Sequence, residues 1–157
     1  MNHQIRFATP QDIDKIIFFI NSIAKYEKLE HEVVLKKETL FKYLFGEKPY
    51  AEVLILEQDE KEVGFALFFH NFSTFEGRPG LYLEDLYILP EFRGNGLGKA
   101  ALKRLAEIAR ERDCARFEWV CLDWNTPSIE FYVKQGANPR KEWIIFRMDG
   151  KNLLNYK

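Results

Sequence analysis

The segment from Arg93 to Lys99 carries the clearest chemical signal in the sequence. It reads Arg-Gly-Asn-Gly-Leu-Gly-Lys, follows a run typical of a β-strand and leads directly into a run typical of a helix. Such a junction points backbone N–H groups and the positive end of the helix dipole at one place, where a phosphate group is stabilised. A Walker-type loop needs Gly at Arg93 and Ser or Thr at Ala100, and a dinucleotide fingerprint needs a glycine at Lys99. The sequence therefore predicts a phosphate-binding loop of another kind.

Two neighbouring acids, Glu84 and Asp85, interrupt an apolar run that is otherwise typical of a strand. Adjacent strand residues point to opposite faces of a sheet, so one of the two side chains must approach the core or a cleft. A buried carboxylate without a partner is costly, so it requires either a cation or a raised pKa. The two acids therefore form a structural ion pair or bind the ammonium group of a ligand.

A second group of acids follows the first expected helix. Glu27, Glu30 and Glu32 lie near its C-terminal end, where the helix dipole disfavours negative charge. They belong either to a solvated loop or to a binding site. The histidines, His3, His31 and His70, are scattered without the spacing of a metal site or a catalytic triad, and we interpret Cys114 and Cys121 as small buried hydrophobic residues.

The elements that must position these residues follow from the hydrophobic pattern. Strands are expected at residues 5–8, 51–57, 63–72, 81–89, 117–122 and 143–148. Helices are expected from Thr9-Pro10 through Ile23, over 37–45, from Leu97 to about Arg112, and from Thr126-Pro127 to Gly136. The order β-α-α-β-β-β-α-β-α-β predicts an α/β fold with a mixed central sheet and helices on both faces. No repeat or linker interrupts the chain, which predicts a single domain over residues 1–157.

Composition and charge narrow the classes of partner. The chain has 157 residues, and its 23 Lys and Arg residues nearly balance 24 Asp and Glu residues. A net charge of −1 gives no general attraction for nucleic acid or for an anionic membrane. The first residues lack the layout of a signal peptide, and no apolar run is long enough for a membrane span. We therefore expect a soluble, cytoplasmic protein.

The pattern Arg-x-x-Gly-x-Gly at a strand-to-helix junction resembles the coenzyme A pyrophosphate loop of the GNAT superfamily of N-acetyltransferases. Further blocks are similar to the diamine acetyltransferases, the spermidine/spermine group. These blocks are Lys25-Tyr26-Glu27, Phe45-Gly46-Glu47-Lys48-Pro49, Tyr82-Leu83-Glu84-Asp85, Trp124-Asn125, Pro127-Ser128-Ile129-Glu130-Phe131-Tyr132 and Gln135-Gly136-Ala137. The resemblance covers nearly the whole chain and implies a GNAT fold, acetyl-CoA as cosubstrate and no metal.

The resemblance also implies roles for individual residues. Tyr132 would protonate the coenzyme A thiolate, and Glu27 would help remove a proton from the amine. The coenzyme would be held by Leu86, Ile88, Arg93, Gly94, Asn95, Gly96, Leu97, Gly98, Lys99, Asn125 and Lys134. The amine would contact Tyr26, Glu27, Glu84, Asp85 and Trp143. Each of four residues also has a structural alternative. Tyr132 and Trp143 would pack in the core, Asn125 would be a loop residue and Lys134 an exposed helical residue.

The expected activity is direct acetyl transfer, in a ternary complex, to a primary amine of a diamine or polyamine. The alternative is a side-chain amine such as that of thialysine or lysine, or a protein amine, and a third possibility is a non-catalytic acetyl-CoA-binding module. Polyamine-directed relatives often carry a tryptophan where Ser73-Thr74-Phe75-Glu76 stands here. Relatives commonly dimerise through C-terminal strands, which implies a homodimer with residues 143–148 at its interface.

Overall fold

The computed structural model describes residues 1–157. The chain forms two compact units, Met1–Leu122 and Asp123–Lys157. The predicted organisation as one acetyltransferase domain stays a prediction. No helix combines the length and the apolar character that a membrane crossing requires.

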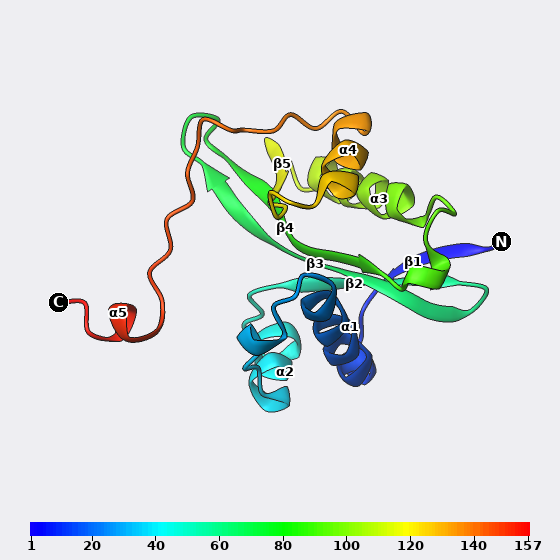
Figure 1. Cartoon of the computed structure of the whole chain (residues 1–157), viewed down its shortest axis with the longest axis horizontal. Helices are drawn as coiled ribbons and strands as arrows, with labels where there is room; N and C mark the ends of the chain where they lie inside the picture. The colour runs from blue at the N-terminus through cyan, green and yellow to red at the C-terminus, as the bar shows by residue number, and fades with distance from the viewer. The chain divides into compact units, whose positions relative to one another are not determined.

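The first unit is built on a five-stranded sheet (Figure 1). Its strands are β1 (His3–Phe7), β2 (Glu52–Gln58), β3 (Lys61–Ser73), β4 (Arg78–Ile88) and β5 (Arg116–Trp119), and they lie in sequence order. The first four pair antiparallel, whereas β5 pairs parallel to β4. The mixed sheet that the sequence predicts is confirmed, with each of these strands displaced by only a few residues from its expected position.

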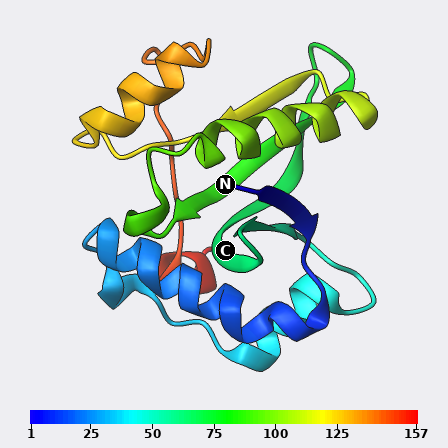
Figure 2. The same cartoon turned by 90° about the vertical axis from the view of Figure 1, so that its right-hand side faces the viewer.

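Helices of the first unit cover both faces of this sheet. They are α1 (Ile13–Tyr26), α2 (Lys37–Phe45) and α3 (Leu97–Glu111), with single 3-10 turns at Pro10–Asp12, Glu30–Glu32 and Pro90–Phe92. Helices α1 and α2 lie on one face and α3 lies on the other, as both views show (Figures 1 and 2). On the α1 face the rings of Phe19 and Phe65 stack with centroids 5.6 Å apart, within a buried cluster that also contains Ile16 and Tyr87. This packing fixes α1 against β3 and β4.

The start of α1 is tied to the sheet by Arg6 on β1. Its guanidinium donates to both carboxylate oxygens of Asp12, at 2.8 and 3.0 Å, and to Glu57 on β2 at 2.7 Å. Asp12 also accepts the backbone N–H of Thr9 at 2.7 Å, which caps the turn before α1. The hydrogen bonds from Arg6 and Thr9 hold the pKa of Asp12 below its usual range although burial opposes them. The predicted Thr9-Pro10 helix start is thus confirmed.

The second unit contains α4 (Thr126–Lys134) and α5 (Gly150–Leu154). Asn125 precedes α4 and accepts the backbone N–H of Ser128 at 3.4 Å, so it is the N-cap of this helix. The expected strand at residues 143–148 is wrong: the segment pairs with no strand, and the order of elements ends in a helix. Its apolar residues match a strand pattern, but strand structure requires a ladder partner, and the second unit contains no strand.

Candidate functional site

The predicted phosphate-binding loop leads into α3 as expected. Gly94 and Gly96 have φ angles of 80° and 84°, in the left-handed region that disfavours side chains, which explains glycine at both positions. Gly96 is the N-cap of α3 and supplies no side-chain cap. The first backbone bond into the helix is from the Ala100 N–H to the Gly96 carbonyl, at 3.0 Å. The N–H groups of the first turn therefore face outward without a cap, an arrangement suited to a phosphate anion.

Beside this loop, β4 and β5 stop pairing halfway along β4. Their ladder runs from Gly80, opposite Arg116, to Leu83, opposite Trp119, and then ends. The rest of β4 has a ladder partner on β3 alone, where Leu86 pairs with Ala66. Backbone groups on the β5 side of this stretch are open to an extended ligand that can bond to a strand edge. Strand β4 is thus separated from β5 over its C-terminal half.

A β-bulge lies where the ladder with β5 ends. On β3, Leu67 pairs with Asp85 whereas Phe68 pairs with Leu83, so Glu84 is an extra residue without a partner. The strand alternation that underlies the prediction of opposite directions for Glu84 and Asp85 breaks at this bulge. Asp85 shares its ladder row with Leu67, two residues from the core residue Phe65, and is therefore on the α1 face.

Three carboxylates come within electrostatic range of one another at this bulge. Burial, followed by the negative charges of Glu84 and Glu27, raises the pKa of Asp85 to about 7. Burial, followed by the charge of Glu84, also raises the pKa of Glu27, which is the C-cap of α1. We call Glu27, Glu84 and Asp85 the acidic cluster. It gathers three of the residues that were predicted to contact the amine.

The acidic cluster has no cationic partner within the first unit. None of the ion pairs of the structure includes one of its three residues, so the structural ion pair that was the alternative for Glu84 and Asp85 is not present. No group of His, Cys, Asp or Glu residues is arranged to hold a metal ion. An organic cation is the ligand that suits such a cluster, because it neutralises the carboxylates and donates hydrogen bonds to their oxygens.

Tyr26 lies at the same end of α1 and contacts Arg93 of the loop. The guanidinium carbon of Arg93 is 5.1 Å from the ring centroid of Tyr26 and 5.2 Å from that of Tyr87 on β4. Its Nε donates to the carbonyl oxygen of Ile88 at 2.7 Å. The side chain of Arg93 is thus directed back onto the sheet and onto α1, a position that the loop pattern alone does not predict.

Sequence reasoning missed one residue of this neighbourhood. Cys121 is partly buried, and burial followed by the charge of Glu27 raises the pKa of its thiol. The thiol is therefore near the acidic cluster. A single cysteine in an apolar run gives no sign of that position, and the interpretation as a small hydrophobic residue had no reason to separate Cys121 from Cys114.

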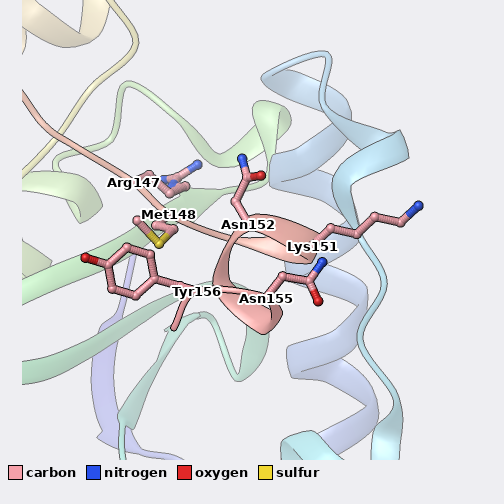
Figure 3. A pocket seen from close by; sticks show the side chains of 6 residues that line it. All are labelled: Arg147, Met148, Lys151, Asn152, Asn155 and Tyr156. Atoms are coloured by element: carbon pink, nitrogen blue, oxygen red, sulfur yellow. The ribbon is translucent and has the colours of Figure 1, made fainter.

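Four of the predicted site residues belong to the second unit. Asn125 is buried and caps α4, the ring of Tyr132 lies 5.5 Å from that of Phe131, Lys134 is exposed, and Trp143 is 73% exposed. Their roles at the site stay predictions. The second unit also has a hollow of about 440 Å³, lined by Arg147, Met148, Lys151, Asn152, Asn155 and Tyr156 (Figure 3). None of the predicted site residues lines it.

Comparisons with known proteins place this geometry in a family. The sequence profile of the Acetyltransferase (GNAT) family matches residues 18–137. The thialysine N-epsilon-acetyltransferase of Mus musculus is 35% identical over 159 residues, which cover 94% of this chain and 93% of that protein. The spermidine/spermine N(1)-acetyltransferase-like protein 1 of Homo sapiens is 31% identical over 162 residues, covering 97% of this chain but 23% of that protein.

A solved structure agrees with the fold. An integron cassette protein from the mobile metagenome of V. cholerae superposes with a TM-score of 0.80 at 26% identity, over 98% of this chain and 96% of its own. Members of the GNAT family use acetyl-CoA as cosubstrate, which matches the uncapped start of α3 and the open edge of β4. The chain belongs to the Acetyltransferase (GNAT) family and is an acetyl-CoA-dependent amine N-acetyltransferase.

Proposed function

We propose that the acceptor is the side-chain amine of a free, lysine-like amino acid such as thialysine. The similarity to thialysine N-epsilon-acetyltransferase over nearly the whole length of both chains supports this choice. The observation that carries the proposal is the acidic cluster, whose three carboxylates have no Lys or Arg partner. A free basic amino acid brings two ammonium groups to such a cluster, one to be held and one to be acetylated.

Asp85 is the proposed base. Attack on a thioester requires a neutral amine, and a carboxyl with a pKa of about 7 accepts a proton from an ammonium group more readily than an ordinary aspartate. Asp85 first takes one proton from the ammonium group. The neutral nitrogen then bonds to the acetyl carbon and the bond from that carbon to sulfur breaks. The departing thiolate takes a proton from Tyr132, and the second proton that the nitrogen loses replaces it. Glu27 and Glu84 hold the substrate's positive charge beside it. Glu27, predicted as the residue that helps remove the proton, keeps a supporting role in this proposal.

The coenzyme would be held mainly by backbone groups. The N–H groups from Gly94 to Lys99 would surround its pyrophosphate at the start of α3, and acetyl-CoA supplies the activated acetyl group. Leu86 and Ile88 lie on the part of β4 that has lost its β5 partner, where backbone groups would bond to the thioester carbonyl and the pantetheine arm. Asn125, Lys134 and the loop side chains remain proposed contacts of the coenzyme.

Tyr132 is the proposed acid for the departing thiolate. Tyr132→Phe removes the hydroxyl and keeps the ring, so turnover should fall at least about tenfold because an acid contributes such a factor or more. The dissociation constant of coenzyme A, measured by calorimetry, should change little. Equal turnover in the variant would remove Tyr132 as the acid.

A panel of amines tests the acceptor. The free thiol that acetyl-CoA releases would be measured with thialysine, lysine, putrescine, spermidine and a lysine-containing peptide. We expect the highest kcat/KM with thialysine or lysine. Binding of coenzyme A without thiol release from any amine would contradict the proposal.

The second candidate is a diamine, favoured by the similarity to the spermidine/spermine acetyltransferase-like protein. Lysine and cadaverine separate the two candidates, because they differ only in the α-carboxylate. Preference for lysine supports an amino-acid acceptor. Preference for cadaverine supports the diamine, since the acidic cluster would then repel the carboxylate that lysine carries.

We also propose that the protein is a homodimer in which a second copy covers residues 143–148. Five apolar residues of this segment, Trp143, Ile144, Ile145, Phe146 and Met148, are between 49% and 90% exposed. Apolar surface of this extent normally marks an interaction site. The predicted cytoplasmic location stays a prediction.

A further inference from the structure

The side chain of Arg93 joins three parts of the site. Its backbone belongs to the phosphate-binding loop, and its guanidinium carbon lies 5.1 Å from the ring centroid of Tyr26 and 5.2 Å from that of Tyr87. Its Nε donates to the carbonyl oxygen of Ile88 at 2.7 Å. One planar group therefore links the loop between β4 and α3, to which Arg93 belongs, to the end of α1 and to the end of β4.

Both rings lie next to members of the acidic cluster. Tyr26 is the last residue of α1 and is followed directly by Glu27. Tyr87 is two residues from Asp85 on β4, is only 7% exposed and belongs to the core cluster that holds α1 against the sheet. Of the two rings, Tyr87 is the fixed one and Tyr26 is the more exposed one. The guanidinium thus connects the exposed end of α1 to a buried residue of β4.

The chemistry of the contact is specific to arginine. A guanidinium can contact an aromatic ring with its flat face while an in-plane N–H donates a hydrogen bond, and the Ile88 carbonyl accepts such a bond from Nε here. A lysine ammonium carries the same charge but has neither the plane nor a donor at the Nε position. Each cation–π contact attracts the guanidinium to the ring, more strongly where water is excluded.

We propose that Arg93 is a positioning residue for the acceptor amine. By holding Tyr26 beside β4 it sets the distance of Glu27 from Asp85 and Glu84, and so the geometry in which the acidic cluster receives an ammonium group. This role rests on the proposed function of the acidic cluster. It is distinct from the contribution of the loop backbone to the pyrophosphate site, because the guanidinium is engaged with α1 and β4.

Arg93→Lys tests this role, since it keeps the positive charge and removes the plane and the Nε donor. We expect KM for the acceptor to rise about three- to tenfold while kcat falls by a smaller factor. The dissociation constant of coenzyme A, measured by calorimetry without acceptor, should stay within about twofold. Thermal unfolding within a few degrees of the wild-type protein confirms that the variant is folded.

A double variant tests the connection through Tyr26. If Arg93 acts through this ring, Arg93→Lys with Tyr26→Leu should raise the acceptor KM no more than the larger of the two single variants does. Multiplication of the two single effects would contradict the proposal. Tyr87→Phe is the matched control, because it keeps the ring that Arg93 contacts, and its acceptor KM should stay within about twofold of wild type.

Two results of Arg93→Lys would overturn the proposal. One is a rise of more than about tenfold in the coenzyme A dissociation constant with an unchanged acceptor KM, which would make Arg93 a phosphate ligand. The other is wild-type behaviour in both measurements. Each KM and dissociation constant of a variant is divided by the wild-type value, measured with the amine that the panel identifies. If the proposed acceptor is wrong, the wild-type protein shows it in the panel, and the ratios still test the role of Arg93.

Discussion

Among single residues, Asp85 has the most specific chemistry. A lysine-like ammonium group has a pKa of about 10.4 in water, and the pKa of an ordinary aspartate is about 3.9. With a pKa of about 7, Asp85 lies between these values, so it accepts a proton more readily than an ordinary aspartate and can still be ionised at neutral pH. Because the three carboxylates interact, activity should report a pKa that belongs to the cluster as a whole.

The pH dependence of activity should change when Asp85 is replaced. In the wild-type protein kcat/KM should rise with pH through a step near 7, as the base loses its proton. Asp85→Asn should lower kcat/KM by about 100-fold or more and abolish that step. The measurement is a pH profile with saturating acetyl-CoA. Asp14→Asn, at an exposed acid paired with Lys37, should retain the wild-type profile. A surviving step near 7 in Asp85→Asn would assign the base elsewhere.

Stability should respond to the same replacement with a definite sign. The pKa of Asp85 is raised from 3.8 to about 7, so between these values the native state binds more protons than the unfolded state. The free energy of unfolding therefore falls as pH rises through this window. Asp85→Asn removes the buried charge and should be more stable than wild type at pH about 8, by at most about 4 kcal/mol. Urea unfolding should show the difference vanish near pH 4, and an equal difference at both pH values would contradict it.

At the scale of elements, regular patterns were sufficient for most of the fold. The periodicity of α1, the glycine and proline boundaries of α2 and α4, and the apolar runs of β2 and β3 predict these elements within a few residues. The bulge at Glu84 could not be predicted, because it arises from a shift in the pairing register of β3 and β4 and not from a local residue preference. The predicted strand at 143–148 failed for a related reason, since strand structure depends on a partner.

The same limit applies to the site. Glu27, Glu84 and Asp85 could be identified as candidates from their unusual places in a helix end and an apolar strand. Two further features of the site depend on how α1, β4 and the segment after β5 approach each other. They are the greater burial of Asp85 and the position of Cys121 near Glu27. Contacts between distant segments of this kind leave no mark in a single sequence.

The loop before α3 allows a prediction about backbone geometry. Gly96→Ala places a side chain at a φ of 84°, which should cost about 1 to 2 kcal/mol or displace the loop, and the affinity for coenzyme A should fall at least about tenfold. Gly77→Ala is a matched control, because Gly77 also has a positive φ, 65°, with open space around its Cα, but lies in the β3–β4 turn. Thermal unfolding should show similar destabilisation of both variants, while calorimetry should show weaker coenzyme binding only in Gly96→Ala.

At the scale of the whole molecule, the two compact units differ in their apolar interior. Every buried hydrophobic residue lies in Met1–Leu122, and none lies in Asp123–Lys157. The apolar residues of the segment 143–148 are exposed, which supports the proposed homodimer.

Sedimentation should show that the wild-type protein is a dimer and that one charged side chain introduced into the segment 143–148 weakens its association. Phe146 is 90% exposed, and Phe146→Lys would place an ammonium group in the proposed interface, so the variant should sediment as a monomer at micromolar concentration. Val34→Lys is the control, because Val34 is 85% exposed in the first unit and outside the segment, and this variant should remain a dimer. A monomeric wild-type protein would contradict the proposed interface.

The early end of the β4–β5 ladder has a consequence for how this protein can diversify. A ligand that bonds to an open strand edge is recognised by main-chain atoms, which every residue type except proline supplies alike. The side chains at positions 27, 84 and 85 are therefore not needed to bind the acetyl donor. A library that randomises positions 27 and 84 while keeping Asp85 should contain many members that still bind coenzyme A and acetylate new amines. The architecture thus separates recognition of the acetyl donor, which stays constant, from recognition of the amine, which can vary.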